Sequence, residues 1–144
     1  MSNVECRTTI NIAKFYTPLQ ILRAMGKFES FEKIVSWQKA REFNKRIYLA
    51  TDHPKFKPHF DFVRQVRRAS MSISSNIAEG FERSTDKEFI YFLFVAKASA
   101  GEVRSQLYLA YDLNCIGQEL FEELVTEITK IAQLISGLIK YLQK

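Results

Sequence analysis

The spacing of apolar residues along the chain is the feature that most constrains its fold. Four segments, at about 30–50, 60–79, 86–113 and 118–143, carry apolar residues every three or four positions, which is the period of one face of an α-helix. The 144 residues include only three prolines and five glycines, and so few breaking residues favour long helices over a turn-rich β fold. With short connections between the segments, the sequence predicts an all-α, antiparallel, up-and-down four-helix bundle.

Local signals refine the predicted helices. Thr85 followed by Glu88 forms a capping-box pattern at a helix start. Gly80 suits the left-handed residue that commonly follows a helix end, so helix 60–79 is expected to stop just before it. Segment 89–96 is rich in β-branched and aromatic residues and has high strand propensity. Because it follows a helix start signal and the helical spacing continues beyond it, we predict that this segment is helical.

Composition bounds the class of protein. An apolar share of 47% and a charged share of 26% are ordinary for a globular domain. The longest run without Asp, Glu, Lys or Arg is ten residues, at 69–78, which is too short to span a bilayer. The N-terminus has no secretory signal pattern, and Cys6 and Cys115 have no metal-binding or redox spacing. We therefore expect a cytoplasmic protein with no membrane partner.

The predicted bundle domain covers residues 28–144. Residues 1–27 are interpreted as an N-terminal extension of uncertain structure, because Pro18 interrupts the helical pattern within them. Met25 and the residues after it look like a natural start. The first 24 residues are therefore expected to be an upstream extension that packs poorly or varies in conformation.

A polar stripe accompanies the apolar face of helix 60–79 and consists of Arg68, Ser72, Asn76 and Glu79. One interpretation is helix packing in which these polar groups are paired with one another. The other interpretation is a functional polar pocket. We expect Glu79 to pair with Arg68, Arg64 or Arg104, which favours the structural interpretation.

The same stretch carries a resemblance to a known family. Its pattern of Arg68, Ser72 and the motif Asn-Ile-Ala-Glu-Gly at 76–80, with further matches at 35–40 and 96–102, resembles the bacterial ribosomal RNA intervening-sequence proteins. The resemblance covers roughly residues 28–144. It implies a four-helix bundle that assembles into a homo-oligomeric ring of five subunits, a pentamer, with no established enzymatic activity. It also implies a relation in fold to the accessory proteins of diversity-generating retroelements.

The predicted helix 86–113 has more apolar surface than a single bundle can bury. When its core face turns inward, four large apolar side chains are left over near its start. Burial of such a side chain is worth roughly 1.5–3 kcal/mol, so a free surface of this kind would favour aggregation. We expect these side chains to form the interface between subunits of a homo-oligomer: Ile90, Tyr91, Phe94 and Val95.

The sequence lacks the patterns of known catalytic, cofactor and metal sites. His53 and His59 are the only histidines, and neither has a glutamate three residues before it, as di-iron sites of helical bundles require. The five glycines are isolated, so there is no Gly-rich phosphate loop, and no Gly-x-Ser-x-Gly elbow occurs. We predict that the protein is not an enzyme and uses no catalytic residues, cofactor or metal.

Positive charge is concentrated in the first half of the chain. Residues 1–72 hold 14 Lys and Arg against 6 Asp and Glu, whereas residues 73–144 hold 7 against 10. The end of helix 30–50, the following loop and the start of helix 60–79 meet in the predicted hairpin, which indicates a cationic corner. Its members are Lys39, Lys45, Arg46, Lys55, Lys57, Arg64 and Arg67.

The cationic corner admits two interpretations. Its cations, with Tyr48, Phe56 and His59 nearby, are suited to hold phosphates and to stack on unpaired bases. Alternatively, they complete helix C-termini and keep the protein soluble. The first interpretation predicts binding of structured RNA or a role as accessory to a nucleic-acid enzyme. The second leaves a protein–protein assembly module that does not bind nucleic acid.

Overall fold

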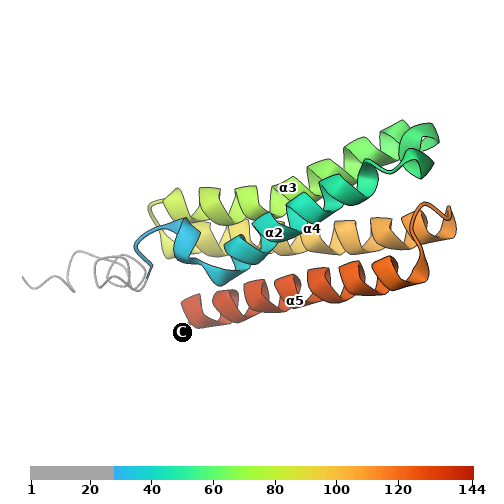
Figure 1. Cartoon of the computed structure of the whole chain (residues 1–144). Helices are drawn as coiled ribbons and strands as arrows, with labels where there is room; N and C mark the ends of the chain where they lie inside the picture. Colours follow the sequence, from blue (N-terminus) through green and yellow to red (C-terminus); the bar gives the residue numbers. More distant parts are fainter. Residues whose placement is uncertain (1–27) are drawn as a thin grey trace, which may run out of the picture.

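The computed structural model describes residues 28–144, which form long helices and no β-strand (Figure 1). The prediction of an all-α fold is therefore confirmed for this part of the chain. The expected N-terminal extension, 1–27, lies outside the described residues, and the division into extension and bundle domain stays a prediction. The elements are η2 (Phe31–Lys33), α2 (Val35–Thr51), η3 (Pro54–His59), α3 (Phe60–Glu82), α4 (Asp86–Asp112) and α5 (Gln118–Leu142), where η denotes a 3-10 helix.

The four long helices lie alongside one another, and the short connections between them alternate between the two ends of the molecule (Figure 1). Helix α3 packs against α2 and α4, while α5 packs against α4 and α2. Each helix contributes fully buried side chains to one common core, among them Phe43, Ile73, Leu93 and Ile131. Between residues 28 and 144, no helix is both long enough and apolar enough to cross a bilayer.

The core face of α2 has a small side chain turned inward and an arginine turned outward. Ile34, just before the helix, and Ala40, Phe43 and Ile47 within it are buried, whereas Arg41 is exposed. The Arg41 guanidinium instead lies 5.7 Å from the centre of the Trp37 ring on the outer side of the helix. The reason is physical: burying a guanidinium without a partner is costly, so the helix turns the small Ala40 side chain inward.

Gly80 has a role that the sequence signal did not indicate. Helix α3 continues through Gly80 to Glu82, so the prediction that Gly80 is a left-handed residue beyond the helix end is wrong. Gly80 is buried, and a Cβ atom added to it would lie 2.6 Å from Cβ of Phe92 and 2.9 Å from Cδ2 of Phe89. The missing side chain therefore lets α3 and α4 approach closely near the connection between them.

The start of α4 follows the predicted capping signal. The backbone amide of Glu88 donates to Oγ1 of Thr85 at 3.2 Å, and this hydroxyl donates to the Glu88 carboxylate at 2.9 Å. Thr85 is the N-cap residue, which satisfies one of the orphan amides of the first turn. Segment 89–96 lies within α4, so the prediction that this strand-prone segment is helical is confirmed.

Candidate nucleic-acid interface

The predicted polar stripe of α3 divides into two parts. Ser72 and Asn76 belong to a partly buried cluster: the Asn76 amide donates to Oγ and to the carbonyl of Ser72 at 2.9 and 2.7 Å, and Ser72 Oγ lies 3.0 Å from Ser99 Oγ of α4. Arg68 and Glu79 are exposed. The expected pairing of Glu79 with Arg68 is wrong, because Glu79 accepts a hydrogen bond from Arg83, one turn further along, at 2.7 Å.

A second polar cluster joins α2 to α3 and was missed by the sequence reasoning. Ser70 Oγ donates to Oδ1 of Asn44 at 2.6 Å, and the Asn44 amide nitrogen donates to Oγ of Ser74 at 2.9 Å. Ser70 is fully buried. Pairing buried polar groups in this way avoids the desolvation penalty of an unsatisfied hydroxyl, so both clusters are explained by helix packing.

Lys39 and Arg46 of the predicted cationic corner are paired with carboxylates on the surface of the bundle. Lys39 forms an ion pair with Glu42 at 2.8 Å on the surface of α2. Arg46 donates to Glu123 at 2.7 Å and also to Glu127, both on α5. The hydrogen bond with Glu123 is the largest cause of the raised pKa of the Arg46 guanidinium, with burial opposing it. Arg46 thus connects the first and last long helices of the bundle, and its charge is compensated there.

Arg67 is held in one orientation by several neighbours. Its Nε donates to Oγ1 of Thr51 at 2.8 Å, and its Nη2 donates to Oδ1 of Asp52 at 2.8 Å and to the carbonyl of Tyr48 at 3.4 Å. Its guanidinium also lies 4.5 Å from the centre of the Tyr48 ring. These contacts fix the guanidinium and the aromatic ring against each other, because cation–π attraction adds to the hydrogen bonds.

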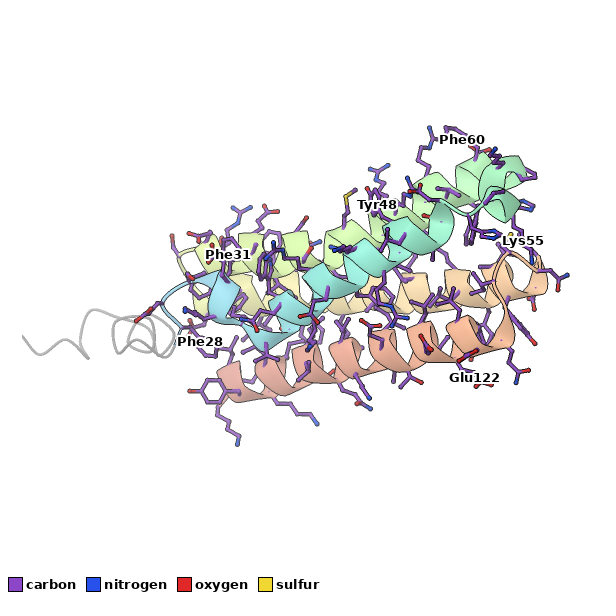
Figure 2. The ribbon with its side chains drawn as sticks, viewed as in Figure 1. Phe28, Phe31, Tyr48, Lys55, Phe60 and Glu122 are labelled. Atoms are coloured by element: carbon purple, nitrogen blue, oxygen red, sulfur yellow. The ribbon has the colours of Figure 1, made fainter. Side chains whose placement is uncertain are left out.

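Arg67 and Tyr48 form one wall of a groove between the second half of α2 and the first turns of α3. The groove has a volume of about 400 Å³. Figure 2 shows Tyr48 and Phe60 on the same side of the molecule, on α2 and at the start of α3. Phe60 is 69% exposed, and the Arg64 guanidinium lies 5.8 Å from the centre of its ring. We call this the basic-aromatic groove; its lining residues are Tyr48, Phe60, Val63, Arg64, Arg67, Arg68 and Met71.

The remaining cations of the predicted corner lie outside this groove. Lys57 lines a neighbouring hollow that shares Phe60 and Val63 with the groove. Lys55 lines a hollow between the two loops at this end of the bundle, where Figure 2 shows it near the start of α5. Lys45 lines a third hollow, beside Trp37 on the outer side of α2. The structure therefore brings Arg64 and Arg67 together but distributes the lysines over several surfaces.

The aromatic residues of the corner also differ from the prediction. Phe56 is 3% exposed and stacks on Phe62, with ring centres 6.0 Å apart, so the expectation that Phe56 stacks on bases is wrong. His59 is partly buried at the end of η3. Phe60 is the exposed ring instead. The sequence did contain a signal that Phe60 accompanies the arginines. Phe60, Arg64 and Arg68 lie at intervals of four residues and therefore share one face of the helix.

The surplus apolar residues of α4 are on the surface of the single chain. Tyr91 is 63% and Phe94 is 48% exposed, while Ile90 and Val95 are partly buried. Further along the same helix, Tyr108 and Leu109 are exposed as well. Exposed apolar side chains gathered on one helix are typical of an interaction site, and the subunit interface formed by Ile90, Tyr91, Phe94 and Val95 stays a prediction.

Within residues 28–144, no three side chains of His, Cys, Asp or Glu come together in a way that could hold a metal ion. The basic-aromatic groove itself is lined by cations, aromatic rings and apolar groups, with no carboxylate among its lining residues. Such a surface is suited to bind anions and planar groups by charge and stacking.

Comparison with known proteins identifies the family. The family model of the 23S rRNA-intervening sequence protein matches residues 32–137. The chain belongs to this family. The chain is also similar to a solved structure from Bacteroides thetaiotaomicron, described as a protein of unknown function from the S23 ribosomal protein family. The two chains share 28% sequence identity and superimpose with a TM-score of 0.67, over 74% of this chain and 96% of that chain.

No curated protein matches the chain. The family match confirms the resemblance that the motif at 76–80 indicated. It also places α2, α3 and α4 and most of α5 within the matched region, so the basic-aromatic groove lies wholly inside the family domain.

Proposed function

We propose that this protein is a non-enzymatic RNA-binding protein that contacts RNA through the basic-aromatic groove. The observation that carries the proposal is the convergence of Arg64, Arg67 and Arg68 with two exposed aromatic rings in one groove free of carboxylates. Arginine binds phosphate with strong charge-assisted hydrogen bonds. Aromatic rings stack on unpaired bases in loops and bulges of structured RNA. The name of the family, which refers to ribosomal RNA, supports the same class of ligand.

We further propose that the bundle is antiparallel, in the up-and-down order, and assembles as a homo-oligomeric ring of five subunits. The alternating connections seen in Figure 1 support the helix order. The exposed Tyr91 and Phe94 of α4 support the assembly, because two such side chains in water are unfavourable for a lone bundle. Such a ring would repeat the groove around its axis, so several phosphates could be bound at once. We expect the protein to work in the bacterial cytoplasm.

A second candidate function is a protein–protein assembly module, or an accessory to a nucleic-acid enzyme, without direct RNA contact. The same exposed apolar surface of α4 favours it, since this surface is suited to a protein partner as well as to a second copy of the chain. The two candidates differ in whether they need the arginines of the groove. RNA binding requires these arginines, whereas assembly with a protein partner does not.

The salt dependence of RNA binding tests the proposed function. The parent protein should bind a structured RNA at low salt, and log Kd should rise with log salt by roughly 0.7 for each phosphate of a single-stranded segment that is neutralised. The double variant Arg64→Ala and Arg68→Ala should lower the affinity and flatten this slope by about 1.4. Both side chains are exposed, so we expect the fold to persist.

The matched control removes two cations from a different surface. Lys97 and Arg104 are exposed on α4, and Lys97→Ala with Arg104→Ala changes the net charge by the same amount. This control should leave the slope almost unchanged. Absence of RNA binding by the parent protein at low salt, or equal slopes for the two double variants, would overturn the proposal and favour the assembly module.

A further inference from the structure

We propose that the basic-aromatic groove takes an unpaired nucleotide, with its base stacked on Phe60 and the phosphates on either side of it bound by Arg64 and Arg68. This inference rests on the proposed function and names the part of an RNA that the groove recognises. It distinguishes the groove from a surface that attracts any polyanion, and it assigns separate roles to the ring and to the two arginines.

Phe60 is the stacking platform because its ring is presented to solvent at the rim of the groove. It is 69% exposed, although a phenyl ring of this size is normally buried in a core. The buried neighbour Phe56 already stacks on Phe62, so the local core is complete without Phe60. A ring this exposed offers the face opposite Arg64 to a planar ligand, and every base has such a face.

Arg64 and Arg68 are available for phosphates, whereas Arg67 is committed. The N–H groups of Arg67 donate to Thr51, Asp52 and the carbonyl of Tyr48. Arg64 has a long contact of 3.9 Å with Asp61, with both side chains highly exposed, and its guanidinium lies over one face of the Phe60 ring. Among the described residues, no carboxylate forms an ion pair with Arg68. The two arginines are four residues apart, about 6 Å along the helix axis, which lets their flexible side chains reach neighbouring phosphates.

The groove reads the face of the base and not its edge. The Tyr48 hydroxyl donates to Sδ of Met71 at 3.2 Å, and Val63 and Phe60 have no polar side-chain atoms. Few donors or acceptors are therefore left to contact a base edge, and edge contacts are what distinguish one base from another. We expect little discrimination between adenine and guanine, and a preference for purines because their larger faces stack better.

A duplex cannot bind in the same way, because pairing and stacking hide the base faces. It can still place its phosphates against the arginines. A phosphopeptide would also satisfy the arginines, but it would gain little from the exposed Phe60 ring. The exposed ring beside two uncommitted cations therefore favours single-stranded RNA over both.

The test compares fluorescein-labelled oligoadenylate with an RNA duplex of equal length, measured by fluorescence anisotropy with the full chain. Phe60→Ala should weaken binding of oligoadenylate by about tenfold or more and leave duplex binding and the salt slope unchanged. The double variant Arg64→Ala and Arg68→Ala should weaken both ligands. Tyr141→Ala removes another exposed aromatic ring, on α5, and should affect neither.

A second variant reports on stacking directly. Trp37 is the only tryptophan in the chain, so Phe60→Trp adds one fluorophore at the groove. Its emission should be quenched by oligoadenylate and not by the duplex.

The outcomes separate the two proposals. If the parent protein binds RNA but Phe60→Ala weakens both ligands equally, or neither, the nucleotide-stacking inference is overturned while RNA binding by charge survives. If the parent protein binds neither RNA at low salt, the proposed function fails and this inference fails with it. Selective loss of oligoadenylate binding together with quenching of Phe60→Trp supports the inference.

Discussion

Gly80→Ala tests whether the close approach of α3 and α4 determines the stability of the bundle. The substitution adds one methyl group at a position where it would lie 2.6 Å from Cβ of Phe92 and 2.9 Å from Cδ2 of Phe89. The first of these atoms is attached directly to the backbone of α4, so it cannot move away by a change of rotamer. The two helices must separate locally to accept the methyl group.

The magnitude follows from two opposing effects. Alanine is favoured over glycine within a helix by about 1 kcal/mol, and Gly80 lies inside α3. Forcing an extra methyl group into a packed core typically costs about 1–3 kcal/mol. Because the contact with Phe92 involves a backbone-attached atom, we expect the upper end of this cost and a net loss of about 2 kcal/mol. For a domain of this size, the melting temperature should then fall by about 8 °C.

Urea unfolding followed by circular dichroism measures this change in the free energy of unfolding. Gly137→Ala is the matched control, since Gly137 lies within α5 and a Cβ there would meet no atom within 4 Å. That control should raise the stability by about 0.5–1 kcal/mol. If Gly80→Ala stabilised the protein as Gly137→Ala does, the argument from close helix approach would be refuted.

Three further predictions concern the surface. Glu79→Ala should change the free energy of unfolding by less than about 0.5 kcal/mol, because the ion pair of Glu79 with Arg83 is exposed. A loss above about 1 kcal/mol in thermal or urea unfolding would instead show that Glu79 belongs to a buried network. Arg46→Ala should lower the free energy of unfolding by about 1 kcal/mol at low salt and by less at high salt, since it removes both ion pairs with α5. The control Lys45→Ala should leave the urea midpoint unchanged at either salt concentration. Equal midpoints for the two variants would contradict the role of Arg46. Phe94→Glu should shift the protein to monomers or to aggregates in light scattering, and a parent protein that is already monomeric would contradict the assembly argument.

The sequence was sufficient to predict the helices because periodicity and capping are local signals. Thr85 fixed the start of α4 correctly, even though the next residues have high strand propensity. Gly80 shows the limit of such signals. A glycine near a predicted helix end is compatible with a left-handed terminus and with a close helix contact, and only the position of α4 decides between them.

The candidate site was predicted less completely for the same reason. Arg64 and Arg67 share a groove, and their role in binding nucleic acid stays a prediction. Arg46 was assigned to it as a free cation, yet its partners are 77 and 81 residues further along the chain. Phe56 and Phe60 are both aromatic and lie close together in sequence, but their burial depends on how η3 packs, which no local pattern reveals.

The link between Arg46 and α5 has a consequence for the newly synthesised chain. At roughly 5–20 residues per second, the 25 residues of α5 take about one to five seconds to be added after α4 and its connection are complete. During that interval α2, α3 and α4 can already pair, but Arg46 has no glutamate to contact, and the face of α4 that packs against α5 is open to solvent. The nascent protein is therefore most exposed to aggregation and to chaperones just before its last helix arrives.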